Sequence, residues 1–254
     1  MIIVESWTKN LTNLQKQYPD AVIIDVTEQA PDEFVRFSPF YPHGGIPVPF
    51  SFGWMSQTVE GIWQGLKIFA HHGIDTGKFN ISDRKSLRRT TRRYGPVTGY
   101  RKGVRGAEIL DYLSARKLIF ASAYLWVMEH RLTGLLSKLR DLSENKTVIL
   151  LDHETNCDIE DLSSPLSHAY LIKSYIEGNY PIPLTLPPSP EEKEVYEVGT
   201  PVYHPMFGPA VVLEDLGERV RVDFEGEEVL LQKRYAKLLR IYENYPDGDY
   251  PDDE

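Results

Sequence analysis

The sequence lacks the residues and runs that several classes of protein require. Its 254 residues include one cysteine, Cys157, which excludes a disulfide within the chain and a cysteine-rich zinc site. The seven histidines follow no metal-ligand spacing such as His-Glu-X-X-His, so we expect no metal site. No apolar run is long enough to span a bilayer and no signal pattern opens the chain, which favours a cytoplasmic protein without membrane contact.

The composition changes along the chain and predicts two domains. Residues 1–180 have the mixed composition of a globular domain, and residues 181–197 form a linker with prolines at 181, 183, 187, 188 and 190. Residues 198–241 show short alternating strands divided by glycine turns, and residues 242–254 are acidic and expected to be disordered. The net charge of −9 argues against a general coating of nucleic acid, although the charge is unevenly placed.

Hydrophobic periodicity predicts the main elements of the first domain. The runs "AVIIDVT" (21–27) and "KTVILLD" (146–152) indicate buried strands. Helices are expected over 58–71, over 107–142 with a break near 121–122, and from 165 to a glycine at 178. We therefore expect an α+β fold with a mainly helical first domain and a small all-β barrel of SH3 or Tudor type at the C-terminus.

The polar face of the helix over 58–71 has two interpretations. Glu60, Gln64 and Lys67 stand at i, i+4 and i+7, so they lie within about 60° of one another on a regular helix. The apolar residues of the helix spread over the other side and are expected to face a core. The polar stripe is therefore either a solvated helix face or the wall of an active site.

Glycines and aromatic residues in and before this helix favour the active-site wall. Gly61 and Gly65 each cost roughly 1 kcal/mol relative to alanine, which suggests a close approach by another element or by a ligand. A carboxylate held among rings often has a raised pKa and is a candidate acid, base or cation stabiliser. The rings that could stack on a planar base or surround Glu60 belong to Trp54, Trp63, Phe37, Phe40, Tyr41 and Phe50.

The segment over 84–105 is strongly basic. It holds nine cationic residues after a single acid, Asp83: Arg84, Lys85, Arg88, Arg89, Arg92, Arg93, Arg101, Lys102 and Arg105. On a helix, Arg88 and Arg92 would stand at i and i+4. The segment is either a solvated face that meets an acidic partner, or a site for a phosphate-bearing small molecule or nucleic acid.

Residues 37–67 resemble the first motif of the NADAR superfamily, whose best-known members are the YbiA-like N-glycosidases. The resemblance rests on a Phe-X-X-Phe-Tyr-Pro run followed by X-X-Glu-X-X-X-Gln-X-X-Lys. The matching positions are Phe37, Phe40, Tyr41, Pro42, Glu60, Gln64 and Lys67, while Pro39 and Thr58 depart from the usual Asn and Ser. The resemblance covers about residues 34–178.

The family's second motif begins with a late aspartate, followed by a Trp-Gly pair that this sequence lacks. The corresponding region here is "LLDHETNCDIED" (150–161), in which Asp152 follows a predicted strand and Asp158 is the alternative. The resemblance implies hydrolysis of the bond between ribose C1 and a base nitrogen, in an ADP-ribosylated or phosphorylated ribosyl substrate. We expect this reaction to need neither metal nor cofactor.

The resemblance and the chemistry together give each residue an expected role. Cleavage of an N-ribosyl bond builds positive charge on the sugar. A carboxylate near C1 can stabilise this charge, or it can orient and deprotonate the attacking water. Glu60 is expected to be this carboxylate, with Asp152 as a second acid/base. The expected substrate-binding residues are Tyr41, Trp54, Trp63, Gln64, Lys67, Arg88, Arg92 and Arg101.

The C-terminal segment resembles the Tudor-like module at the C-terminus of UvrD/PcrA-type helicases, over about 198–240. The matching positions are Val198, Gly199, Val202, His204, Phe207, Gly208, Val211, Val222 and Phe224. The resemblance implies an interaction module for protein or nucleic acid, with Phe207, Val211, Val222 and Phe224 in the core.

A non-enzymatic interpretation also fits the sequence. The same pocket and the basic segment over 84–105 could bind a nucleotide, ADP-ribose or nucleic acid without chemistry. Convergence of Glu60 with Asp152 or Asp158 across a cleft lined by tryptophan would favour the enzyme, while a solvent-exposed Glu60 with no second carboxylate nearby would favour this alternative.

Overall fold

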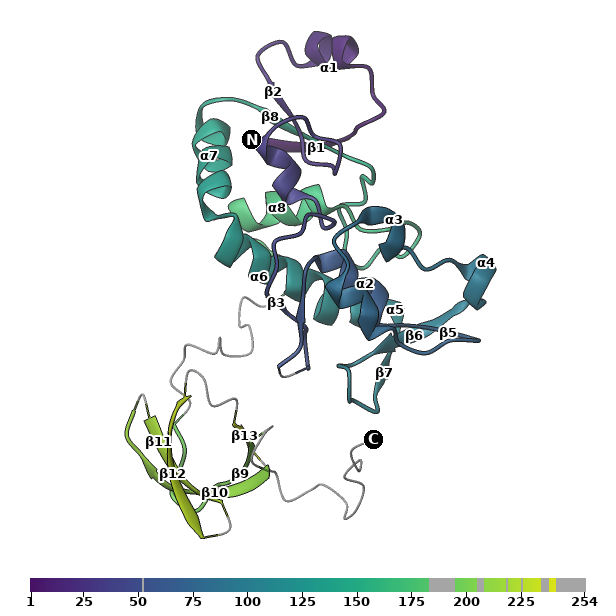
Figure 1. Ribbon diagram of the computed structural model, residues 1–254. Helices are drawn as coiled ribbons and strands as arrows, with labels where there is room; N and C mark the ends of the chain where they lie inside the picture. The colour runs from purple at the N-terminus through teal and green to yellow at the C-terminus, as the bar shows by residue number, and fades with distance from the viewer. Residues whose placement is uncertain are drawn as a thin grey trace. The chain divides into compact units, whose positions relative to one another are not determined.

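The computed structural model describes residues 1–51, 53–182, 195–204, 208–217, 219–224, 226–233 and 238–240. The chain divides into two compact units, Met1–Leu184 and Thr185–Glu254 (Figure 1). Most of the predicted linker (183–194) and the whole acidic tail (242–254) lie outside the described residues. Among the described residues, no helix combines the length and the apolar character that crossing a membrane requires.

A three-stranded parallel sheet forms one end of the first unit. Its order is β1 (Ile2–Ser6), β8 (Val148–Asp152) and β2 (Val22–Asp25), with β8 in the centre and buried along its whole length. Helix α1 (Leu11–Gln17) packs on one face through Leu14, and α8 (His168–Ile176) contacts the sheet on the other side (Figure 1). The predicted strands over 21–27 and 146–152 are confirmed.

The sheet and its flanking helices make the first unit mixed rather than mainly helical. Between β2 and β8 in the sequence, the chain forms most of the helices of this unit. They are α5 (Tyr112–Ala115), the π-helical turn η3 (Arg116–Ala121), α6 (Ser122–Arg131) and α7 (Thr133–Asn145). The predicted break near 121–122 is wrong, because Ala121 and Ser122 both have helical backbone angles and the helical chain continues from η3 into α6. The chain leaves the helical conformation instead at Leu132, whose side chain is buried.

Helix α2 (Val59–Leu66) is shorter than predicted. Thr58 caps its start, since its hydroxyl accepts from the Gly61 amide at 2.8 Å. The helix ends at Leu66 because Lys67 begins strand β5 (Lys67–Phe69) and pairs with Tyr100 of β6 (Val97–Arg101). Strand β7 (Ile109–Leu110) completes this three-stranded sheet. The predicted extension to residue 71 is therefore wrong, since ladder bonds replaced the last helical turn.

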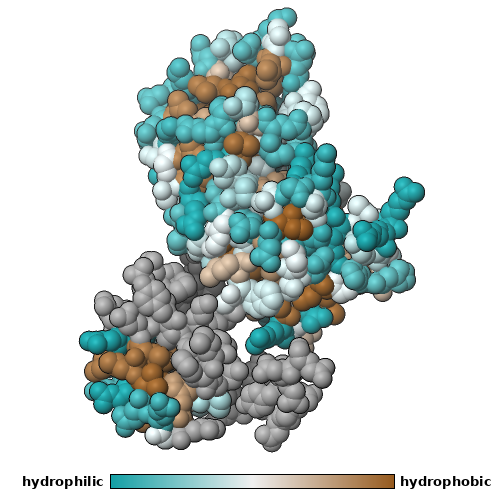
Figure 2. All heavy atoms as spheres, in the orientation of Figure 1, coloured by the Kyte–Doolittle hydropathy of each residue, from teal (hydrophilic) through white to brown (hydrophobic). Residues whose placement is uncertain are grey.

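Short elements join these layers. They are η1 (Glu33–Phe37), β3 (Ile46–Pro47), β4 (Met55–Ser56), η2 (Thr76–Asn80), α3 (Arg84–Leu87) and α4 (Thr91–Tyr94). Strands β3 and β4 pair with each other, and η2 packs against α2. Hydrophilic side chains cover the projecting part of the unit that carries α4 (Figures 1 and 2).

The second unit is an open antiparallel sheet in the described residues. Its order is β12 (Glu227–Gln232), β11 (Arg219–Phe224), β10 (Gly208–Asp215), β9 (Pro201–His204) and β13 (Leu239–Arg240). The antiparallel pairing of β11 with β12 agrees with the alternating strands predicted over residues 198–241. The predicted closed barrel is wrong for these residues, because β12 and β13 remain unpaired edges of the sheet.

The core of the second unit uses one face of β9, β10, β11 and β12. Val202, Val212, Val220 and Val222 are fully buried. Val211 is 43% exposed, so its predicted place in the core is wrong; strand alternation turns inward its neighbour Val212 instead. Phe224 packs at the edge of this core, and Phe207 lies outside the described residues.

Candidate functional site

Glu60 lies in the first turn of α2, against the loop that carries the Phe-X-X-Phe-Tyr-Pro run. Its backbone amide donates to the Pro39 carbonyl at 3.0 Å, which ties the start of the helix to that loop. One turn later, Gln64 Nε2 donates to Glu60 Oε1 at 2.7 Å. The helix therefore places the amide of Gln64 directly beside the carboxylate of Glu60, as the i, i+4 spacing predicted.

The environment of Glu60 changes its acidity. Burial raises the pKa of the carboxyl, while the Gln64 hydrogen bond and the positive charges of Lys67, Arg88 and Arg84 oppose this rise. The net pKa lies above the ordinary value for a glutamate, although the side chain keeps partial contact with solvent. A partly exposed carboxyl of this kind can exchange protons with a bound molecule at a higher pH than an ordinary glutamate.

Lys67 reaches the same region from β5 rather than from the helix. Its Nζ lies 5.6 Å from the centre of the Trp63 ring and 5.8 Å from that of Tyr100. Burial lowers the pKa of Lys67 and Arg89 lowers it further, while Glu60 opposes the change. Trp63 stacks on Tyr100 at 4.1 Å, so one face of this predicted stacking platform is already covered by the protein.

The close approach predicted at the two helix glycines is confirmed, and it comes from η2. A Cβ at Gly61 would lie 2.8 Å from the Lys78 carbonyl oxygen, and a Cβ at Gly65 would lie 2.3 Å from Phe79 Cε1. These glycines therefore let a neighbouring element, not a ligand, pack on α2.

The predicted aromatic pocket around Glu60 forms only in part. Trp54 packs edge-on against Phe79, on the side of α2 that carries the glycines and so away from Trp63. Tyr41 contacts the ring of His43 at 4.8 Å and is partly buried.

Phe37 lies wholly in the core, and Phe50 is 50% exposed, so neither ring fits a wall of the expected pocket. Phe40 faces the Arg84 guanidinium at 5.4 Å.

The basic segment is not one helix. Arg88 has an extended backbone between α3 and α4, so the predicted i, i+4 pairing of Arg88 with Arg92 is wrong. Asp83 caps α3 with two hydrogen bonds, and the chain then straightens before α4 starts. Arg88 and Arg92 are exposed, and Arg101 is partly buried.

Arg89 has a structural role that the sequence did not reveal. It is buried, and its guanidinium donates to the carbonyls of Gln64 at 3.0 Å, Lys67 at 2.7 Å and Gly73 at 2.6 Å. A cation at the C-terminus of α2 also complements the helix dipole. Arg89 thus holds the turn at which Lys67 leaves the helix.

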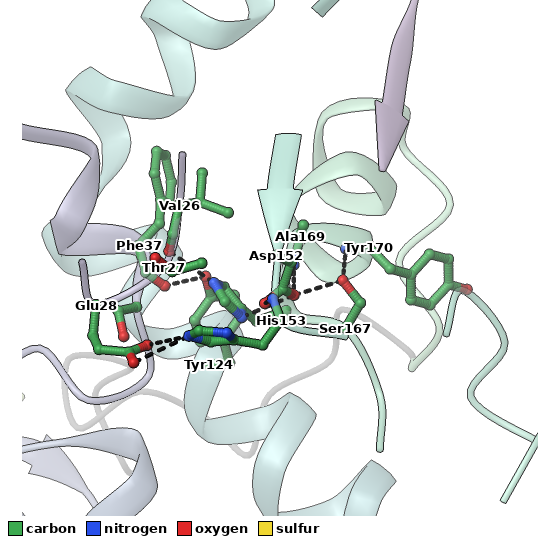
Figure 3. A network of polar contacts seen from close by, with 12 residues as sticks. Val26, Thr27, Glu28, Phe37, Tyr124, Asp152, His153, Ser167, Ala169 and Tyr170 are labelled. Atoms are coloured by element: carbon green, nitrogen blue, oxygen red, sulfur yellow. Dashed lines mark hydrogen bonds and ion pairs between the residues drawn. The ribbon is translucent and has the colours of Figure 1, made fainter. Parts of the chain in front are cut away.

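Asp152 lies at the end of β8 and is saturated with hydrogen bonds (Figure 3). Its Oδ2 accepts from the Ser167 hydroxyl at 2.7 Å and the Ala169 amide at 3.2 Å, and lies 3.0 Å from His168 Nδ1. Its Oδ1 accepts from the His153 amide at 2.6 Å. Burial alone would raise the pKa of Asp152, but His168 and these hydrogen bonds hold it well below the ordinary value.

These contacts describe a group that joins β8 to α8. They fix the start of α8 at His168 with Ser167 as its cap, three residues after the predicted start at residue 165. The acid/base role of Asp152 stays a prediction, and its alternative Asp158 is exposed and accepts from the Glu160 amide in a turn.

A polar cluster missed by sequence reasoning lies at the same edge of the sheet. The Glu28 carboxylate pairs with Arg84. It also lies 3.0 Å from His153 Nε2 (Figure 3). Trp7 packs edge-on against the His153 ring at 4.9 Å. Trp7, Glu28 and His153 each follow a different parallel strand, and only the strand order could have shown that they meet. In the described residues, no three His, Cys, Asp or Glu side chains are grouped to hold a metal ion.

Comparison with known proteins gives a family but no activity. No curated protein and no solved structure matches the chain. A family described as "Family of unknown function (DUF6939)" matches residues 6–172, which include strands β2 and β8, α2 and the cluster around Glu28. The chain therefore belongs to the DUF6939 family.

Proposed function

We propose that the first unit hydrolyses an N-ribosyl bond in a phosphorylated or ADP-ribosylated ribosyl-nucleobase substrate, with Glu60 as the key carboxylate. The observation that carries the proposal is the Glu60–Gln64 pair on α2. A partly buried carboxyl with a raised pKa lies beside an amide and within the field of three cations. The ionised carboxylate would deprotonate the attacking water or stabilise the positive charge that develops at C1.

The hydrogen bonds of the Gln64 side chain also support the proposed function. Its side chain is only 7% exposed, and its Oε1 has no hydrogen-bond partner among the residues that the structure describes. A buried acceptor without a donor costs about 1–3 kcal/mol, so such groups are rare unless a ligand or water pairs with them. A ribose hydroxyl is a donor of the right kind, held next to the carboxylate that acts on C1.

The cations around Glu60 support a phosphorylated substrate. Arg88 is exposed, Arg84 is partly exposed, and the charges of both act on Glu60. Guanidinium groups bind phosphate oxygens through paired hydrogen bonds. Arg92 and Arg101, the other two arginines among the predicted binding residues, belong to the same basic segment and would contact more distant parts of a larger substrate.

The second unit is proposed to be a Tudor-like interaction module. Its open antiparallel sheet leaves the strands β12 and β13 with unpaired edges in the described residues. Such edges and the small apolar core suit the binding of a protein or nucleic-acid partner rather than chemistry. This role would bring the first unit to its substrate in the cytoplasm.

The test is the release of free base, followed by chromatography with mass detection. Purified protein would be incubated with ADP-ribosylated guanine nucleotides, ADP-ribosylated DNA and ribosylamino-pyrimidine phosphates. The proposal predicts that the wild type releases the base from at least one of these and that Glu60→Gln does not. Glu144→Gln, which changes an exposed glutamate of α7, serves as the matched control.

The same experiment addresses the non-catalytic alternative. Exposed Arg88 and Arg92 would also serve a protein that only binds nucleotides, ADP-ribose or nucleic acid. Binding of these compounds by wild type and Glu60→Gln alike, without release of base from any of them, would favour that alternative.

A further inference from the structure

The carboxyl ends of the three parallel strands bring together residues that are distant in sequence. Trp7 follows β1, Glu28 lies three residues beyond β2, and His153 follows β8. In open parallel sheets, ligands bind outside this edge, where the loops after the strands converge. Here the convergence is direct, because His153 contacts both Trp7 and Glu28.

The Glu28 carboxylate fixes the proton position on His153. His153 Nε2 lies 3.0 Å from both Glu28 oxygens, so Nε2 carries a hydrogen and donates it to the carboxylate. Nδ1 has no hydrogen-bond partner in the part of the chain that the structure describes, and the side chain is 29% exposed. A carboxylate behind one ring nitrogen stabilises the imidazolium and leaves the other nitrogen able to give or take a proton.

The charges around Glu28 keep it ionised for this role. Burial raises its pKa, but hydrogen bonds and the charges of His153 and Arg84 outweigh burial, so the pKa lies below the ordinary value. The other carboxylates that act on this histidine or adjoin it are Asp152, which accepts from the His153 amide, and Glu154. His153 is thus placed among carboxylates on its own loop and on the loop after β2.

Continuous contacts link this cluster to Glu60. Arg84 pairs with Glu28, lies over the Phe40 ring, and its charge acts on Glu60. The residue before Phe40 is Pro39, whose carbonyl accepts from the Glu60 amide. Arg84 therefore connects the Glu28–His153 pair to the surroundings of Glu60.

We propose that His153, positioned by Glu28, is the proton donor to the departing base in the hydrolysis proposed for Glu60. The step balances as follows. The C1–N bond breaks, and His153 Nδ1–H gives its proton to the leaving nitrogen. Water adds its hydroxyl to C1 and gives its proton to Glu60, from which solvent returns a proton to His153. Asp152 is then a positioning residue, because it orients the His153 backbone and takes no part in proton transfer.

This inference rests on the proposed function, and leaving-group dependence tests the two separately. The probes are a ribosyl 5-phosphate of a nucleobase, which needs a proton to depart, and 4-nitrophenyl riboside 5-phosphate, whose phenolate departs without one. His153→Gln should lower kcat for the nucleobase substrate about 10²–10⁴-fold and change the nitrophenyl substrate less than about 10-fold. Glu60→Gln should reduce the turnover of both.

The positioning role of Glu28 supplies the second readout. Glu28→Gln should lower kcat for the nucleobase substrate and change the nitrophenyl substrate much less, since it removes the carboxylate that accepts the His153 Nε2 hydrogen. His130→Gln, which changes an exposed histidine of α6, is the control and should leave both rates unchanged.

The outcomes separate the two claims. Equal loss on both substrates in His153→Gln, or no loss on either, would reject the proton donor and leave Glu60 hydrolysis standing. A wild type that cleaves neither probe nor any compound in the panel above would reject the hydrolase and the proton donor together. Circular dichroism and thermal unfolding would show that each variant is folded.

Discussion

Nδ1 of His168 lies 3.0 Å from Oδ2 of Asp152, and the two form a buried pair at the junction of β8 and α8. The other ring nitrogen, Nε2, lies 2.8 Å from the Val26 carbonyl, so both nitrogens face acceptors and the ring is held as an imidazolium. The pair connects the central strand, the continuation of β2 and the start of α8. It is a structural counterpart of the more exposed Glu28–His153 pair nearby.

Removing one partner of this pair should be strongly destabilising. Asp152→Asn would leave the His168 cation buried without its counter-charge, which typically costs about 3–5 kcal/mol in unfolding free energy. Urea unfolding measures this loss. Asp158→Asn, at the exposed aspartate of the following loop, should change stability by less than about 0.5 kcal/mol. Equal effects of the two substitutions would contradict the structural role of Asp152.

The same pair should shape the pH dependence of stability. Burial lowers the pKa of His168, but Asp152 and the Val26 carbonyl outweigh burial and raise it. The contribution of charged His168 to stability is therefore complete below the unfolded histidine pKa of about 6.5 and is lost as pH rises through the folded pKa. Asp152, whose pKa is lowered, contributes fully to stability above its unfolded pKa of about 3.9, and this contribution is lost as pH falls through the folded pKa.

Urea unfolding at a series of pH values checks this window. The pair should contribute fully between about pH 4 and pH 6.5. Relative to a double variant Asp152→Asn/His168→Gln, the wild type should lose stability on both sides of that window. A constant difference between the two proteins from pH 3 to pH 9 would show that the pair is not linked to protons.

Two glycine substitutions should act in opposite directions. Gly65→Ala puts a Cβ 2.3 Å from Phe79 Cε1, and such overpacking should cost about 1–3 kcal/mol in spite of the better helix propensity of alanine. Gly134 lies in α7, and a Cβ there meets no heavy atom within 4 Å, so Gly134→Ala should stabilise by up to about 1 kcal/mol. Thermal unfolding of the two variants measures the contrast, and a stabilised Gly65→Ala would contradict the packing of η2 on α2.

Lys67 should set the acid limb of the proposed activity. A general base works when ionised, so kcat/KM should fall as pH falls through the raised pKa of Glu60. Lys67 lowers that pKa, so Lys67→Met should move the acid limb to higher pH, whatever it does to the maximal rate. A limb that stays in place, or moves to lower pH, would show that another group controls it.

Local pattern was sufficient for the strands and the core of the helix around Glu60. The apolar run before Asp152 and the i, i+4 spacing of Glu60 and Gln64 predicted the observed strand and contact, because both depend on neighbours in sequence. The end of α2 could not be predicted, since it is decided by pairing of Lys67 with Tyr100 and by the buried Arg89. These partners come from distant segments.

The cluster around His153 shows the same limit at the candidate site. Trp7, Glu28 and His153 lie far apart in sequence, and no spacing pattern relates them to one another. They meet only because the three strands are parallel in the order β1-β8-β2. The sequence pattern pointed to Asp152, one residue before His153, because the end of a strand can be recognised in the sequence. The hydrogen bonds that the Asp152 carboxylate accepts in the fold cannot be recognised there.

The most direct test of the account is kcat/KM of Glu60→Gln on the substrate that the wild type cleaves best. The substitution keeps the size of the side chain and its place beside Gln64 but removes the carboxylate. The account predicts a loss of at least about 10²–10³-fold with folding intact, while Glu144→Gln retains wild-type activity. A folded Glu60→Gln that cleaves the substrate as fast as the wild type would contradict the assignment of α2 as an active-site wall.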